Sequence, residues 1–220
     1  METLKRMVRL LALRVALLAI CICAGVGHAQ PQDRPFEQTY RAILPQEVET
    51  GDRIEVIDFF WYGCPFCYTL LPVFTEWEKR KPEDVVVRRI PAVLREGWLA
   101  DAHLYYTLEL LGEAERLHAR VFDSVHQDHL RTSDPEAVAA WAAKNGIDAQ
   151  KWQRAYTDNE VRSRVIRAMT LARNYDVRGT PAVIVDGRYQ TSSGIAGGVN
   201  HVPAVLDRLI NLARERRKKP

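Results

Sequence analysis

One apolar stretch, Ile54–Phe60, restricts the possible folds of this chain more than any other feature. Its sequence, I-E-V-I-D-F-F, is rich in β-branched and aromatic residues and follows a Gly-Asp turn, as expected for a buried strand. Apolar residues then recur at helical spacing from Pro65 to about Lys79, and proline suits a first helical turn. A second strand is predicted at residues 85–90. These segments form a β-α-β unit, for which we expect parallel strands and a right-handed crossover.

The character of the chain changes between Trp98 and Tyr175. β-rich runs are almost absent there, and apolar residues recur at helical spacing. Asp134-Pro135 is a favourable helix start, and Asn145-Gly146 is a favourable helix end. We therefore predict an all-helical insertion domain at residues 93–175.

Strand signals return after the helical block. Residues 182–185 and 188–191 flank the hairpin dipeptide Asp186-Gly187, and residues 202–212 have the pattern of an amphipathic helix. The order β-α-β, helical insertion, β-β-α predicts an α/β protein. Its sheet-bearing domain would comprise residues 36–92 and 176–213. The basic residues that follow predict a solvated C-terminal tail at residues 214–220.

The first 29 residues have the layout of a secretory signal peptide. Four basic residues precede an apolar core at residues 15–26, and small residues follow it up to a cleavage site after Ala29. An uncleaved membrane anchor is the alternative, although this core is too short to span about 30 Å of hydrocarbon. Cleavage would remove four basic residues and one acidic residue, leaving 27 of each. The resulting zero net charge argues against a nucleic-acid binder. The signal itself predicts an exported protein.

Cleavage would also leave only two cysteines, Cys64 and Cys67, at the junction of the first strand and its helix. Unpaired backbone N–H groups and the helix dipole favour a thiolate at that position. We expect Cys64 to be the exposed nucleophile and Cys67 the resolving thiol, one turn inward. A zinc site would lack further ligands. A structural staple would gain little from so short a loop, and inert core cysteines are disfavoured beside a β-α-β unit. The motif predicts redox chemistry with no metal and no cofactor.

Two further features bear on the dithiol. Asp58 lies within the buried strand, where desolvation favours its neutral form. It would exchange a proton with Cys67 if it points beneath the helix end; the alternative is that it points elsewhere and pairs with a base. Thr180-Pro181 precedes a predicted strand. A cis bond there would expose the Thr180 backbone to an extended peptide, whereas the local sequence alone favours a trans turn.

Four segments together resemble the DsbA-type thiol:disulfide oxidoreductases of the bacterial periplasm. They are V-I-D-F-F-W-Y-G-C-P-F-C-Y from Val56, R-R-I-P-A-V from Arg88, L-Y-Y-T-L-E-L-L-G from Leu104 and V-R-G-T-P-A-V-I-V-D-G-R-Y from Val177. The resemblance extends from about Phe36 to Leu212. It implies a thioredoxin fold with an inserted helical domain. It also implies donation of disulfides to unfolded exported polypeptides, and reoxidation by a DsbB-type quinone-linked membrane oxidase.

The resemblance also assigns roles to residues by position. Cys64 would be the attacking cysteine, Cys67 the resolving cysteine and Asp58 the buried acid, with a cis peptide bond at Pro181. The residues expected to contact substrate flank the dithiol: Pro65, Phe66, Thr180 and Pro181.

One departure from the family pattern concerns Phe66, where the best-known members carry histidine. Phenylalanine can neither donate a hydrogen bond nor carry positive charge, so we expect the pKa of Cys64 to lie above that of such relatives, but below that of free cysteine. We therefore expect a weaker oxidant than the relatives that carry histidine at this position.

Two alternative functions remain: a disulfide isomerase or reductase, and a chaperone-like peptide-binding module. We expect a monomer, and ordinary surface or half-buried roles for four histidines of the helical block: His103, His118, His126 and His129.

Overall fold

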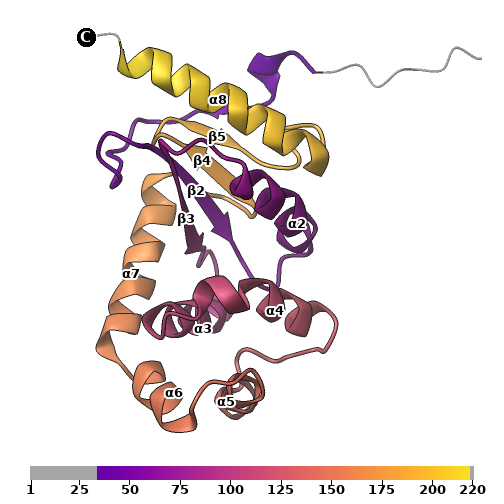
Figure 1. Cartoon of the computed structure of the whole chain (residues 1–220), viewed down its shortest axis with the longest axis vertical. Coiled ribbons are helices and arrows are strands. Elements are labelled where there is room, and N and C mark those ends of the chain that lie inside the picture. The colour runs from indigo at the N-terminus through magenta and orange to yellow at the C-terminus, as the bar shows by residue number, and fades with distance from the viewer. Residues whose placement is uncertain (1–33, 219–220) are drawn as a thin grey trace, which may run out of the picture. The chain divides into compact units, whose positions relative to one another are not determined.

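A computed structural model describes residues 34–218 of the chain; the predicted signal peptide, residues 1–29, lies outside the described residues. Figure 1 shows a twisted sheet with helices packed along it and a separate helical layer beyond one end of its strands. The strand order across the sheet is β1 (Arg41–Ala42), β5 (Tyr189–Thr191), β4 (Ala182–Val185), β2 (Ile54–Phe60) and β3 (Val85–Pro91). Strands β2 and β3 are parallel, which confirms the predicted β-α-β unit, and the other pairs are antiparallel.

The helices follow the predicted order. They are α2 (Pro65–Lys79), α3 (Leu99–Leu110), α4 (Ala114–His126), α5 (Pro135–Lys144), α6 (Ala149–Tyr156), α7 (Asn159–Asn174) and α8 (Val202–Arg217). Short 3-10 turns lie at Phe36–Gln38, Glu96–Trp98 and Val199–His201. All regular structure between β3 and β4 is helical, as predicted. Within the described part of the chain, every helix is too short or too polar to cross a membrane.

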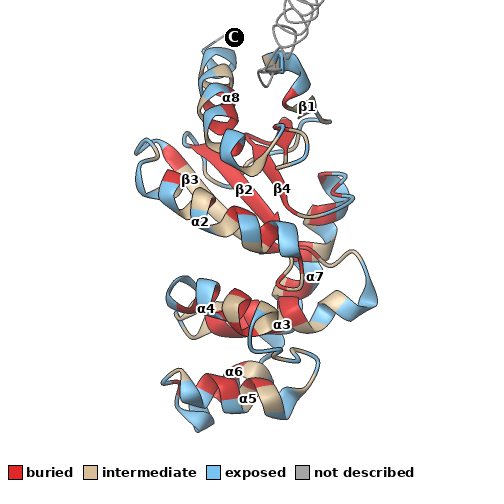
Figure 2. Ribbon diagram, turned by 90° about the vertical axis from the view of Figure 1, so that its right-hand side faces the viewer, coloured by how far each residue is buried: buried red, intermediate tan, exposed pale blue. Residues whose placement is uncertain are grey.

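Strand β2 lies at the centre of the packing, because all seven of its residues are buried (Figure 2). Successive side chains of a strand point to opposite faces of the sheet. Ile54 and Val56 accordingly pack with residues of α2 and α8, whereas Ile57 and Phe59 join the core formed with α3, α4 and α7. Asp58 has the parity of Val56, so its side chain projects toward α2.

The helix boundaries in the insertion follow capping chemistry. Asp134 precedes α5 and its Oδ1 accepts hydrogen bonds from the backbone N–H groups of Glu136 and Ala137, both at 3.1 Å. Asp148 caps α6 in the same way through the backbone N–H of Lys151, at 2.9 Å. Such a cap contributes about 1 kcal/mol, which explains why α5 begins where the sequence predicts and why α6 begins after Asp148.

The β4–β5 hairpin turns at Asp186-Gly187, as predicted. Both residues have positive φ, 52° and 64°, which is the geometry of the tight turn that suits twisted strands. A side chain at Gly187 would collide with the backbone of Gln46. Strand β5 begins at Tyr189, one residue later than predicted, because the turn extends through Arg188.

The last helix is longer than predicted. It continues past residue 212 to Arg217, so the segment expected to begin a solvated tail is helical. Two arginines hold this extension: Arg214 Nη2 lies 2.6 Å from Asp84 Oδ1, and Arg217 Nη2 lies 2.5 Å from Asp186 Oδ1. Asp186 is itself buried. Arg214 and Arg217 are therefore partners of acidic side chains on the sheet domain, which a charge count along the sequence does not reveal.

Candidate active site

Cys64 occupies the N-cap position of α2, directly after β2 and a short turn. Its Sγ accepts a hydrogen bond from the backbone N–H of Cys67 at 3.3 Å, and Pro65 is the first residue of the helix. The first N–H groups of a helix lack partners within the helix, so a sulfur at the N-cap receives both a hydrogen bond and the positive end of the helix dipole. The predicted placement of Cys64 at the helix start is confirmed.

The expectation that Cys64 is exposed is wrong. Only 4% of its surface is accessible, the same fraction as for Cys67, and both are free thiols. The cause is the Thr180-Pro181 segment: the Cys64 thiol donates to the carbonyl oxygen of Thr180 at 3.3 Å. The neighbouring Phe66 is 67% exposed. The reactive sulfur is therefore recessed beside an exposed apolar side chain rather than displayed on the surface.

The two thiols differ strongly in acidity. A hydrogen bond from the Cys67 thiol lowers the pKa of Cys64 to about 6; burial opposes this shift, and the Thr180 side chain and the backbone N–H groups of Cys67 and Phe66 support it. Burial raises the pKa of Cys67, and its hydrogen bond to Cys64 raises that pKa further. At pH 7 a thiol with a pKa of about 6 carries about ten thiolates for each neutral thiol. The pair therefore consists of one reactive thiolate and one thiol that stays protonated.

Asp58 lies beneath the N-terminal part of α2, with 8% of its surface accessible. Burial raises its pKa to about 6, and the positive charge of Arg89 opposes this shift. Arg89 is opposite Asp58 in the register of β2 and β3, but its guanidinium group pairs with Glu78 and Glu115. Asp58 Oδ1 has no hydrogen-bond partner among residues 34–218. The predicted effect of desolvation on Asp58 is thus confirmed.

The Thr180-Pro181 peptide bond is cis. The local sequence alone favoured a trans turn, so this feature follows the family resemblance rather than the local pattern. Thr180 is half-buried and Pro181 is buried, and both lie just before β4. The fold therefore brings Thr180 to Cys64 across 116 positions of sequence.

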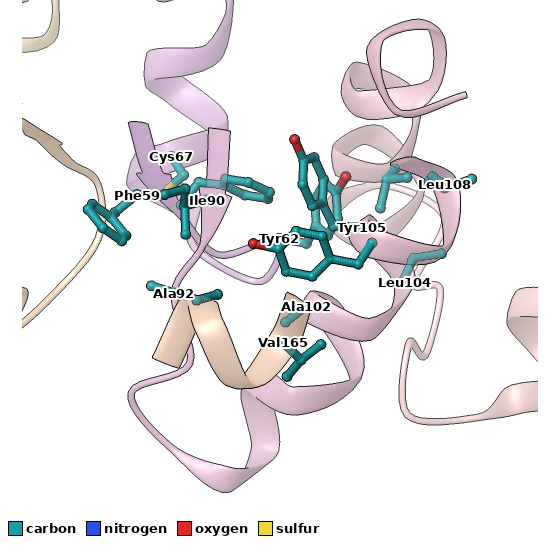
Figure 3. Packing of buried hydrophobic residues seen from close by; sticks show 14 of the residues in the cluster. Phe59, Tyr62, Cys67, Ile90, Ala92, Ala102, Leu104, Tyr105, Leu108 and Val165 are labelled. Atoms are coloured by element: carbon teal, nitrogen blue, oxygen red, sulfur yellow. The ribbon is translucent and has the colours of Figure 1, made fainter. Parts of the chain in front are cut away.

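Aromatic residues around the dithiol divide between core and rim. Tyr62 is fully buried and packs against Phe60 with ring centroids 5.0 Å apart; Figure 3 shows it among the side chains of the helical layer, near Tyr105. Trp61 is half-buried, stacks on Trp98 at 4.2 Å and donates to Asp101 at 2.7 Å. The core thus continues from the sheet into the insertion through the segment that carries Cys64.

Sequence reasoning missed His118, which was expected at the surface or half-buried. It is 5% exposed, lies in α4 and has its Nδ1 3.2 Å from the Tyr62 hydroxyl. Burial lowers its pKa to about 3, so the ring is neutral. A signal was present: His118 is four residues before Phe122, so the two share a helix face, and Phe122 is buried. In residues 34–218 no three His, Cys, Asp or Glu side chains form a metal-binding group.

A thioredoxin-like sheet with an acidic thiol at a helix N-terminus, a partner thiol one turn inward and a cis-proline facing them defines a thiol:disulfide oxidoreductase. Residues 91–209 match the model of the DSBA-like thioredoxin domain; this match includes Thr180-Pro181 and begins after the two cysteines.

Relatives cover more of the chain. The thiol:disulfide interchange protein DsbA of Azotobacter vinelandii is 38% identical over 78% of this chain and 81% of its own length. The DsbA of Pseudomonas aeruginosa is 33% identical over 93% of this chain and 97% of its own length. The crystal structure of the Pseudomonas aeruginosa protein superposes with a TM-score of 0.80 and 32% identity, covering 86% of this chain and 99% of that one. The chain belongs to the DsbA-like thioredoxin domain family.

Proposed function

We propose that this protein introduces disulfide bonds into exported polypeptides, with Cys64 as the sulfur that substrate thiols attack. One arrangement carries the proposal: Cys64 is the N-cap of α2 and its Sγ accepts a hydrogen bond from the backbone N–H of Cys67. The groups around this sulfur lower its pKa to about 6. Opening a disulfide between Cys64 and Cys67 would release a stabilised thiolate, and a couple whose reduced form is stabilised is an oxidising one.

The proposed reaction begins with the oxidised protein. A substrate thiolate attacks Cys64 Sγ, a bond forms between these two sulfurs, and the Cys64–Cys67 bond breaks. Cys67 leaves with the electron pair and takes a proton from Asp58, directly or through water. A second substrate thiolate then attacks the substrate sulfur of the mixed disulfide. Cys64 leaves as a thiolate, so the substrate loses two electrons and the protein gains two.

The proton transfer explains why an acid is needed beside Cys67. Burial raises the pKa of this thiol, so a bare Cys67 thiolate is a poor leaving group at neutral pH. Asp58, with a pKa raised to about 6, carries the proton in part of the population near neutral pH and regains it from solvent afterwards.

The substrate is proposed to bind as an extended chain along the segment that contains Thr180 and Pro181. The Thr180 carbonyl already lies within hydrogen-bonding distance of Cys64 Sγ, so a peptide paired with this backbone would hold its cysteine close to the reactive sulfur. The exposed ring of Phe66, with Pro65 beside it, would contact apolar side chains of that peptide.

The remaining assignments extend this function to the whole chain. Residues 36–92 and 176–213 would form the thioredoxin-fold domain, residues 93–175 the helical insertion domain and residues 214–220 the C-terminal end. Residues 1–29 would direct export to the periplasm and be removed. A DsbB-type quinone-linked membrane oxidase would then reoxidise the dithiol of a monomeric protein.

The direct test uses a reduced, unfolded peptide with two cysteines. The oxidised protein should oxidise it stoichiometrically, whereas Cys64→Ala and Cys67→Ala, which cannot form the internal disulfide, should be inactive. When Cys67→Ala is mixed instead with the disulfide form of the same peptide, its Cys64 thiolate should attack the peptide disulfide, release the other peptide thiol and form a mixed disulfide. Circular dichroism checks that both variants are folded. A Cys64→Ala variant as active as the wild type would overturn the proposal and favour a peptide-binding module.

The equilibrium with glutathione separates an oxidase from a reductase or isomerase. We expect the protein disulfide to be reduced readily by glutathione, because the reduced form contains the stabilised Cys64 thiolate. A disulfide that persists in excess reduced glutathione would instead indicate a reductase.

A further inference from the structure

A small cavity lies beneath the N-terminal turn of α2, next to Cys67. Its volume is about 10 Å³, close to what a single water molecule requires. Apolar side chains form most of its wall, and its potentially hydrogen-bonding side chains are Asp58, Cys67 and His118. Asp58 Oδ1 and His118 Nε2 are both buried without a hydrogen-bond partner among residues 34–218. Two such atoms on residues that line one cavity of this size indicate a site for one bound water.

Tyr62 determines which nitrogen of His118 carries the proton. Its hydroxyl is buried, and the partner that the structure gives it is His118 Nδ1, at 3.2 Å. If Nδ1 carried the proton and donated it, the hydroxyl hydrogen of Tyr62 would be left without an acceptor, which is costly in the interior. The hydroxyl therefore donates to Nδ1. Because the ring is neutral, its proton is on Nε2, which makes Nε2 a donor.

His118 also lines an open cleft of about 270 Å³, together with Arg89 and Glu115. His118 Nε2 is not accessible from this cleft, since the atom is buried. The Nε2–H group is thus available to the polar groups of the inner cavity.

We propose that His118 is a positioning residue for proton transfer at the buried dithiol. Its Nε2–H group, oriented by Tyr62, donates through one bound water to the carboxylate that Asp58 becomes when it gives its proton to Cys67. This inference rests on the function proposed above. The Cys67 thiolate gains the proton that the Asp58 carboxyl group loses. The water accepts a hydrogen bond from Nε2–H and donates one to the Asp58 carboxylate, and it is not itself consumed. His118 therefore stabilises ionised Asp58 and lowers the pH range in which Asp58 is protonated and can serve as the donor.

Other groups act on Asp58 from each packed element. The cation of Arg89 on β3 favours its ionised form, whereas Glu78 on α2 and the Cys64 thiolate favour its neutral form. Tyr105 on α3 is close enough to Asp58 to interact with its charge, and Glu115 on α4 forms an ion pair with Arg89. On β4 the residue opposite Asp58 is the apolar Val183. None of these groups changes when His118 is replaced, so the effect of His118 can be measured separately.

The test is a ¹³C NMR titration of the Asp58 carboxyl group in the reduced protein, with Asp58→Asn to assign the signal. Replacing His118 alone by Phe would leave the Tyr62 hydroxyl without its acceptor, so the main variant is the double one, Tyr62→Phe with His118→Phe. We expect its Asp58 midpoint to rise by about one pH unit, because a donor to the charged form is lost. His118→Gln, which retains an N–H donor, should shift the midpoint less than half as much.

His103→Phe is the matched control. His103 also has a buried ring nitrogen without a partner, but it packs against Tyr156 and does not line the cavity. Its substitution should leave the Asp58 midpoint unchanged. An Asp58 midpoint in the double variant equal to that of the wild type would overturn the role of His118. Failure of the wild-type protein to oxidise peptide would instead overturn the proposed function and leave this titration interpretable.

Discussion

The thiol of Cys64 lies 3.3 Å from the carbonyl oxygen of Thr180, a residue 116 positions further along the chain. Two distant parts of the sequence therefore form the surroundings of the reactive sulfur. The N-terminus of α2 supplies N–H groups, and the segment before β4 covers the sulfur. This arrangement leaves 4% of Cys64 accessible while its pKa falls to about 6.

The lowered pKa of Cys64 predicts that the reduced protein is more stable than the oxidised one. A group whose folded pKa is depressed contributes stability above its unfolded pKa, here about 9, and loses it as the pH falls through about 6. We expect the difference in unfolding free energy to be about 2–4 kcal/mol near pH 8 and to shrink by pH 5. Urea denaturation of both forms at several pH values measures it. An oxidised form that is more stable at pH 8 would contradict the assignment as an oxidant.

Substitution of Phe66 by His should lower the pKa of Cys64 further. A histidine at this position of the first helical turn can place a donor or a positive charge near the sulfur, which phenylalanine cannot. Thiolate absorbance at 240 nm, followed against pH in the reduced protein, gives the midpoint directly. Phe66→Leu is the control, and its midpoint should match that of the wild type. Equal midpoints for the His and Leu variants would show that residue 66 does not act on the thiolate.

Asp58→Asn should change how stability depends on pH. The raised pKa of Asp58 means that the wild type has its full contribution to stability below about pH 4 and loses it as the pH rises through about 6. The variant has no such loss, so relative to pH 4 it should gain about 1–3 kcal/mol over the wild type at pH 7.5. Equilibrium unfolding of the oxidised forms at both pH values checks this. A constant difference between the proteins would mean that Asp58 titrates normally.

Gly63→Ala should disturb the rim beside the dithiol. A Cβ at Gly63 would collide with the ring of Trp61, which is fixed by its stacking on Trp98 and its hydrogen bond to Asp101. We expect a loss of about 1–3 kcal/mol in unfolding free energy. Gly97→Ala is the control, since nothing lies within 4 Å of its added Cβ. In a Trp61→Ala background the Gly63 substitution should cost much less, and an undiminished cost would place the strain elsewhere.

Local patterns along the sequence predicted the elements closely. The apolar run of β2 and the helical spacing after Cys64 identify Ile54–Phe60 and Pro65–Lys79 because each element buries a large apolar face. Long-range features were less accessible. The burial of Cys64 depends on Thr180, and the end of α8 depends on ion pairs with Asp84 and Asp186. His118 was missed because a lone histidine in an amphipathic helix gives no sign of which residue it meets in space.

The position of the helical block between β3 and β4 has a consequence for the protein's own biogenesis. Strand β2 pairs with β4, which is more than 120 residues later in the chain, and the same late segment covers Cys64. A nascent chain therefore has its cysteines long before it has the Thr180-Pro181 segment that covers Cys64. The Thr180 side chain, which supports the low pKa of Cys64, is also made only in this last part of synthesis, whereas the Cys67 and Phe66 groups that lower that pKa are made with the dithiol itself.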